Sequence, residues 1–142
     1  MTTRITSIAF LLVLLAGPLP AAAQEVVAVV SARSPVTALN AEQVADIFLG
    51  KATRFPNGNQ AVPIDQNEES AVREKFYAQF TGKSPAQVKA HWAKIIFTGR
   101  GQPPREVRSA EEAKRLVVEH PGVVCYIERS QVDRSLNVLL VQ

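Results

Sequence analysis

The chain has 142 residues, of which 46% are hydrophobic and 20% charged, and its formal net charge is +3. Its basic residues are scattered among acids without interleaved aromatic residues, which argues against nucleic acid as a partner. With one cysteine and no cluster of ligands at metal-binding spacing, we expect no disulfide, no metal and no other cofactor.

The N-terminal segment has the order of a secretory signal. Arg4 precedes an apolar run over residues 8–16, and three alanines follow at 21–23. The run is shorter than the roughly 20 residues of a membrane-spanning helix, so an uncleaved anchor is the less favoured alternative. We therefore predict a signal peptide over 1–23 and one α/β domain over 24–142. We expect a periplasmic or secreted location, without stable membrane insertion after the signal is removed.

The first predicted elements of the mature part are a strand and a helix. The nearly continuous apolar run over residues 25–31 predicts a strand that is buried on both faces. Asn40, with Gln43 three residues further on, is typical of a helix start, and Gly50 suits the stop of that helix.

A second strand and two helices are predicted in the middle of the chain. A short strand over 61–64 should lead into a helix that starts near Asn67 and ends at Gly82. Ser84 and Pro85 then begin another helix, on whose apolar face Trp92 should lie in the core. The Gly-, Pro- and Arg-rich residues 97–108 read as a loop.

The last elements are a helix and two strands. Ser109 and Glu112 form a capping-box pattern for a helix that stops at 120–122. Apolar runs over 123–127 and 137–141 predict strands, and Cys125 in the first of them reads as a buried, unreactive thiol. Strands that alternate with helices imply a layered α/β domain with a parallel or mixed sheet flanked by helices.

Three stretches together resemble the phosphate-binding proteins of ABC transporters. They are "LNAEQVADIFLGKATRFPNG", "VPIDQNEESAVREKF" and "PGVVCYIERSQV", and their order and spacing agree with that family. The resemblance implies a type II periplasmic binding protein fold, in which two α/β lobes close on a ligand. This chain has about half the required length, so the resemblance implies a single three-layer lobe, the one that carries the phosphate loop.

The resemblance also places a modified phosphate cradle in the second stretch. The Ser-Gly-Thr of the family falls on Ser70, Ala71 and Val72, and its upstream arginine falls on Gln66. The serine is kept, while the glycine, the threonine hydroxyl and the arginine charge are lost. Arg73 and Arg100 could restore positive charge, although each is more simply a solvated surface residue. The predicted ligand-binding residues are Gln66, Asn67, Ser70, Ala71, Arg73 and Arg100.

Two acids, Glu68 and Glu69, stand beside the predicted helix start. A like-charge pair at ~4 Å costs on the order of 4 kcal/mol at an effective dielectric near 20. That is a large share of the roughly 8 kcal/mol of a micromolar affinity. The repulsion shrinks if both carboxylates turn outward to water.

These observations lead to two functional hypotheses. The first is an exported, non-enzymatic solute-binding-like protein that binds phosphate or another small anion. The alternative is a protein-interaction module of the cell envelope that kept the fold and lost the ligand. Since one lobe offers half a cleft, a buried site would need a second copy or an envelope protein as its facing wall. No nucleophile–base pair or paired carboxylates suggest an enzyme.

Overall fold

The computed structural model describes residues 17–18 and 25–139, so the predicted cleavage site lies outside the described residues. The strands are β1 (Val26–Ser31), β2 (Val62–Gln66), β3 (Arg105–Val107), β4 (Val123–Glu128) and β5 (Leu136–Val138). The helices are α1 (Ala41–Phe48), α2 (Ala71–Thr81), α3 (Pro85–Phe97) and α4 (Ala110–Glu119). None of these helices is long and apolar enough to cross a bilayer.

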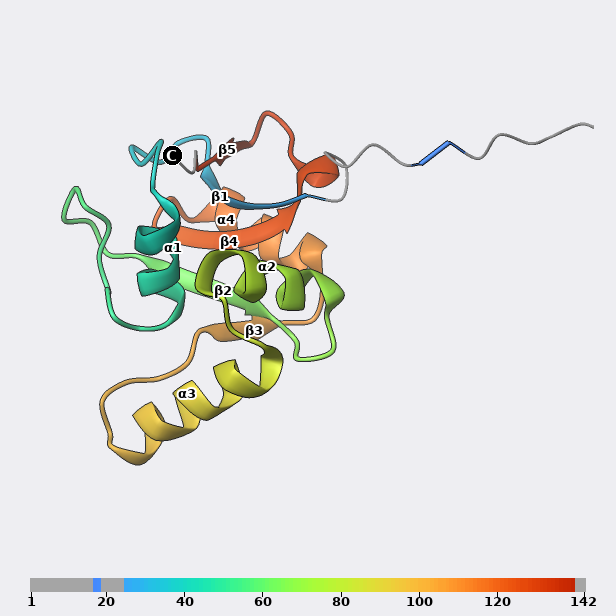
Figure 1. Cartoon of the computed structure of the whole chain (residues 1–142). Coiled ribbons are helices and arrows are strands. Elements are labelled where there is room, and N and C mark those ends of the chain that lie inside the picture. Colours follow the sequence, from blue (N-terminus) through green and yellow to red (C-terminus); the bar gives the residue numbers. More distant parts are fainter. Residues whose placement is uncertain (1–16, 19–24, 140–142) are drawn as a thin grey trace, which may run out of the picture.

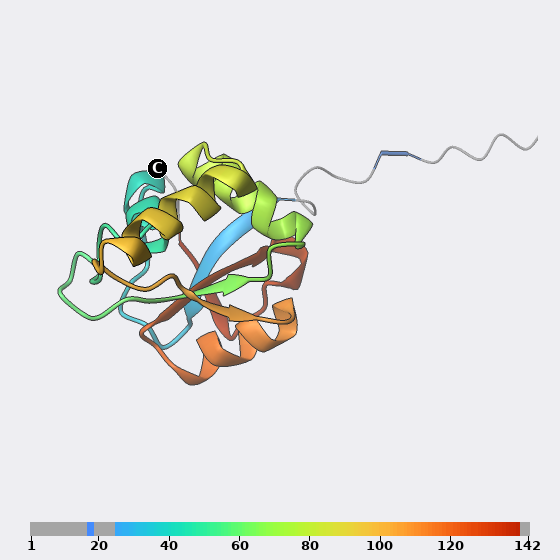
Figure 2. The same cartoon turned by 90° about the horizontal axis from the view of Figure 1, so that it is seen from below.

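A five-stranded sheet in the order β3-β2-β4-β1-β5 forms the middle layer. It is mixed, because β2 runs parallel to β3 and β4, while β1 runs antiparallel to β4 and β5. Figures 1 and 2 show α1, α2 and α3 on one face and α4 on the other. The predicted three-layer α/β lobe is thereby confirmed.

The strand β1, which lies between β4 and β5, is buried on both faces, as its apolar run predicted. Val26, Ala28 and Val30 face the core cluster shared with α1, α2 and α3. Val27 and Val29 face the second cluster, which is shared with α4. Because successive side chains of a strand point to opposite faces, a run with no polar interruption serves both layers.

Two of the predicted helix starts have complete capping boxes. In α1, the Asn40 side chain accepts a hydrogen bond from Gln43 N (2.8 Å), and Gln43 Oε1 accepts one from Asn40 N (2.9 Å). In α3, Ser84 and Gln87 exchange the same pair of bonds, at 3.3 and 2.8 Å. These bonds satisfy N–H groups that have no acceptor within the helix.

The helix after β2 begins later than expected. Ser70 is its N-cap and Ala71 its first residue, whereas the sequence predicted a start near Asn67. The difference arises because Asn67 makes a turn of its own. Its Oδ1 accepts from Glu69 N (3.1 Å) and its carbonyl accepts from Ser70 N (3.0 Å). Glu68 and Glu69 therefore lie in this turn, before the helix.

The predicted loop over 97–108 contains the short edge strand β3. Arg105 and Glu106 are exposed and only Val107 is buried. Three residues with a single buried position give no apolar pattern from which a strand could be predicted. Just after β3, Ser109 caps α4 by accepting from Glu112 N (3.1 Å). The Glu112 carboxylate accepts from Arg108 N, one residue earlier than in a standard capping box.

Trp92 and Cys125 have the buried positions that the sequence predicted. Trp92 is 6% exposed and packs against Gly50, at the end of α1. Cys125 is 1% exposed, and its burial raises the pKa of the thiol to about 12. The thiol is therefore protonated at neutral pH and unreactive.

Candidate functional site

The turn between β2 and α2 is the predicted strand-to-helix junction. Ser70 Oγ accepts from Arg73 N (3.2 Å), which satisfies one N–H of the first helical turn. The N–H groups of Ala71 and Val72 have no acceptor within the helix, as at any helix start. Such N–H groups, with the positive end of the helix dipole, favour an anion.

Gln66 and Ser70 bind each other and tie the turn to the neighbouring strand. The Ser70 hydroxyl donates to Gln66 Oε1 (2.9 Å), and Gln66 Nε2 donates to the carbonyl of Tyr126 on β4 (3.0 Å). Gln66 is 7% exposed. Its side chain therefore does not extend into solvent in place of the family's arginine. It fixes the orientation of the Ser70 hydroxyl instead.

A buried carboxylate, Asp65, lies directly beneath this turn. Its Oδ1 accepts from Gln66 N (2.9 Å), from Arg73 Nε (3.2 Å) and from the hydroxyl of Tyr126. Its Oδ2 accepts from the hydroxyl of Tyr77 (2.7 Å). Sequence reasoning missed this cluster. The available signal was an acid at the end of a buried strand, because a charge taken out of water needs partners.

The charges in this cluster compensate one another. Burial first, and then the charge of Asp65, raises the pKa of both Tyr77 and Tyr126, so their hydroxyls stay protonated donors. Burial alone would lower the pKa of Arg73, but the charge and hydrogen bond of Asp65, together with Tyr77 and Tyr126, outweigh it and the pKa is raised. Arg73 is thus a paired structural cation, and Asp65 cancels the positive charge that it brings to the turn.

The two acids of the turn face water. Glu68 and Glu69 are exposed, and Glu68 Oε2 lies 3.9 Å from Lys89 Nζ on α3. In bulk water a like-charge pair at ~4 Å costs about 1 kcal/mol, a quarter of the cost at an effective dielectric near 20. Because both acids are exposed, the repulsion between each of them and a bound anion should be closer to the value in bulk water.

The structure does not bring Arg100 to this turn. Arg100 follows α3, where its backbone N–H donates to Ile95 O (3.1 Å). Figures 1 and 2 both show the end of α3 on the opposite side of the molecule from the loop that joins β2 to α2. The residues that do gather at the start of α2 are Gln66, Asn67, Ser70, Ala71 and Arg73.

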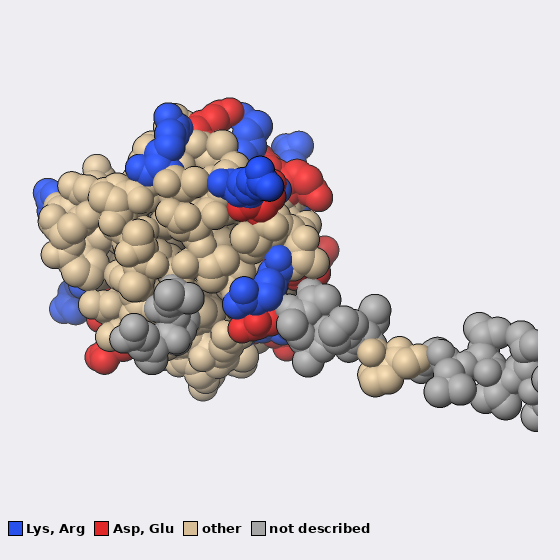
Figure 3. Space-filling model, turned by 90° about the horizontal axis from the view of Figure 1, so that it is seen from above, with Lys and Arg blue, Asp and Glu red and all other residues tan. Residues whose placement is uncertain are grey.

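Among the described residues, no group of three His, Cys, Asp or Glu side chains is placed so that it could hold a metal ion. On the face shown in Figure 3, basic side chains stand beside acidic ones. Beneath the helix start, Asp65 and Arg73 are paired and so offset each other's charge.

Comparison with solved structures finds several proteins with a similar fold. A phosphate ABC transporter substrate-binding protein from Clostridium perfringens, with bound phosphate, matches with a TM-score of 0.66 and 20% identity over 82% of this chain and 44% of that one. An ABC-type phosphate transport receptor from Vibrio cholerae matches with a TM-score of 0.63 and 21% identity, over 82% and 45%. PstS from Borrelia burgdorferi matches with a TM-score of 0.56 and 17% identity, over 82% and 47%.

These likenesses confirm the predicted resemblance at the level of the fold. The chain spans less than half the length of these neighbours, as expected of a single lobe. The sequence itself matches no protein-family model and no curated protein.

Proposed function

We propose that the chain is an exported, non-enzymatic solute-binding-like protein that holds phosphate or another small anion at the start of α2. The observation that carries the proposal is the shared fold with a protein whose crystal contains bound phosphate. The β2–α2 turn, where the resemblance places the family's cradle, supports it further. The neighbours are named as binding proteins and a receptor, which favours binding over catalysis.

Each residue of the turn has a stated role in this proposal. The N–H groups of Ala71 and Val72 bind the anion, aided by the helix dipole. The side chains of Ser70 and Asn67 supply further polar contacts. Gln66 and Arg73 act as positioning residues: Gln66 bonds Ser70, and Arg73 is tied to Asp65. Arg100 is not part of this arrangement.

Affinity should be modest unless a second body covers the anion. Small-ligand sites bury about 70–90% of their ligand, and one lobe supplies one wall. A second copy of the chain, or another envelope protein, would supply the facing wall.

The test is heat denaturation with and without millimolar phosphate, sulfate and organic anions. A ligand that binds only the folded protein stabilises it by about 2.7 kcal/mol at 100 times its Kd, so the midpoint should rise. Ala71→Glu places a carboxylate at the exposed first position of α2, where it favours the helix but repels an anion. It should keep the fold and lose the shift.

Ala71→Gln is the matched control, with nearly the same shape and no charge, and it should keep the shift. An unchanged midpoint in every anion would remove the proposal. An equal shift in Ala71→Glu would show that the anion binds elsewhere.

The export part of the proposal has its own measurement. The mass of the protein isolated from the native envelope or culture medium should correspond to a chain that begins at Gln24. A full-length mass in the cytoplasmic fraction would contradict it.

A further inference from the structure

A second candidate site lies at the other end of β2, away from the α2 turn. It is a cavity of about 380 Å³ between the end of α1, the middle of α3 and the starts of β2 and β3. This volume lies within the roughly 300–1,000 Å³ of small-molecule sites. The anion proposed above does not use it.

The walls of the cavity are mainly apolar. Trp92 and Pro104 lie at one side, Val62 lies across from them, and Pro63 also lines the cavity. Val62 is 39% exposed, which is unusual for a large apolar residue in this protein, and it marks the open side. A flat apolar molecule could pack against the indole ring and the proline rings.

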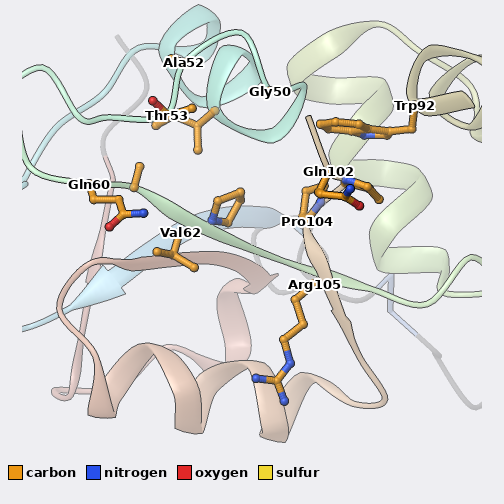
Figure 4. Close-up of a pocket in the computed structure, with 13 residues that line it drawn as sticks. Gly50, Ala52, Thr53, Gln60, Val62, Trp92, Gln102, Pro104 and Arg105 are labelled. Atoms are coloured by element: carbon orange, nitrogen blue, oxygen red, sulfur yellow. The ribbon is translucent and has the colours of Figure 1, made fainter. Parts of the chain in front are cut away.

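The polar groups at the cavity are neutral. The carboxamides of Gln60 and Gln102 lie at two of its sides, and Figure 4 shows Gln102 beneath the indole of Trp92. Arg105 is the charged residue in the lining, but Figure 4 shows its guanidinium directed toward α4. The charge is therefore not available inside the cavity, and a neutral ligand fits it better than an anion.

One residue that lines the cavity carries a buried donor without a partner. Trp92 Nε1 is shielded from water and has no hydrogen-bond partner among the described residues. Buried donors are nearly always paired, so an orphan in a residue that is 6% exposed requires an explanation. If the ring turns so that Nε1 faces the cavity, an acceptor oxygen on a molecule bound there would supply that partner.

We propose that this cavity binds a small, neutral, planar molecule that carries both an acceptor and a donor, such as an aromatic or heterocyclic amide. Trp92 stacks on its ring, while Gln60 and Gln102 exchange hydrogen bonds with its polar groups. The proposal is independent of the anion site, since the two lie at opposite ends of β2.

The chain offers a direct readout, because Trp92 is its single tryptophan. The experiment titrates ¹⁵N-labelled protein with benzamide and nicotinamide at millimolar concentrations, and with benzoate as the charged counterpart. The indole N–H signal of Trp92 and the carboxamide signals of Gln60 and Gln102 should shift saturably with the two amides. Benzoate should give a much smaller shift, because Arg105, the charged residue of the lining, directs its guanidinium away from the cavity.

Two variants keep the test specific. Gln102→Ala changes an exposed residue and should weaken amide binding about two- to tenfold, the value of one hydrogen bond. Gln79→Ala, on the exposed face of α2, is the matched control and should bind as the wild type does. No saturable shift of the Trp92 signal with either amide would overturn the proposal. The proposal would also be overturned if benzoate bound as strongly as the amides and Gln102→Ala left the binding unchanged.

Discussion

Gly50 offers the sharpest test of how α1 and α3 pack together. Its φ is +74°, and a Cβ built there would lie 2.6 Å from Cη2 of Trp92. Real Cβ atoms essentially never make a contact that short, and the indole, which is 6% exposed, can give way only toward the cavity that both residues line. Gly50→Ala must therefore shift the ring, the end of α1, or both.

Two costs add in Gly50→Ala. A left-handed backbone costs a non-glycine residue roughly 1–2 kcal/mol, and displacing packed side chains to admit an extra methyl group costs about 1–3 kcal/mol. We therefore expect a loss of about 2–5 kcal/mol, against a total stability of about 5–15 kcal/mol for an ordinary domain. At typical urea slopes, a loss of about 3 kcal/mol lowers the unfolding midpoint by roughly 1–3 M.

The assay is urea unfolding followed by the fluorescence of Trp92, with Gly82→Ala as the control. Gly82 directly follows α2, whereas Gly50 lies two residues after α1. The φ of Gly82 is +69°, but nothing lies within 4 Å of a built Cβ. Gly82→Ala should therefore show only the backbone cost, and Gly50→Ala should be less stable by the contact term. Equal losses in the two variants would refute the packing argument.

Further predictions concern the cluster beneath the turn and the buried thiol. Asp65→Asn should lower the free energy of unfolding by about 3–5 kcal/mol, because it leaves Arg73 charged, buried and unpaired. The double variant Asp65→Asn/Arg73→Met should recover part of that loss. A loss in the double variant equal to the sum of the losses in the two single variants would contradict the pairing. Burial raises the pKa of Cys125 from 9.0 to about 12, so the folded state holds its proton more tightly than the unfolded state. That stabilisation is complete below about pH 9 and is lost as the pH rises toward 12, with Tyr77 and Tyr126 acting in the same direction, since their pKa values are also raised. Urea midpoints measured between pH 7 and pH 11 should fall above about pH 9, and a rise would contradict the direction. At neutral pH a thiol reagent should modify Cys125 only in urea, and rapid modification of the native protein would show that the strand opens.

Most of the layer architecture could be read from local patterns. The unbroken apolar run of β1 required a sheet covered on both faces, and the capping residues Asn40 and Ser84 fixed two helix starts. These signals act within a few residues and do not depend on distant contacts. The fold was therefore accessible from the sequence before any pairing of strands was known.

The chemistry of the site was less accessible, because it depends on pairings across the chain. Arg73 looked like a free cation, and only the fold reveals that Asp65 neutralises it. Tyr126 reaches the same carboxylate from a strand 61 residues away in sequence. The start of α2 was misplaced because the local turn of Asn67 competes with a helix start, and both use the same residue type.

Direct phosphate binding tests the central claim, that the start of α2 still holds an anion. Equilibrium dialysis with radiolabelled phosphate should give one site per chain in the wild type. The double variant Glu68→Gln/Glu69→Gln should bind more tightly, because two exposed like charges, each worth about 1 kcal/mol or less, are removed. Tighter binding in this variant, with loss of binding in Ala71→Glu, is the predicted result. Absence of bound phosphate in both the wild type and the double variant would contradict the account.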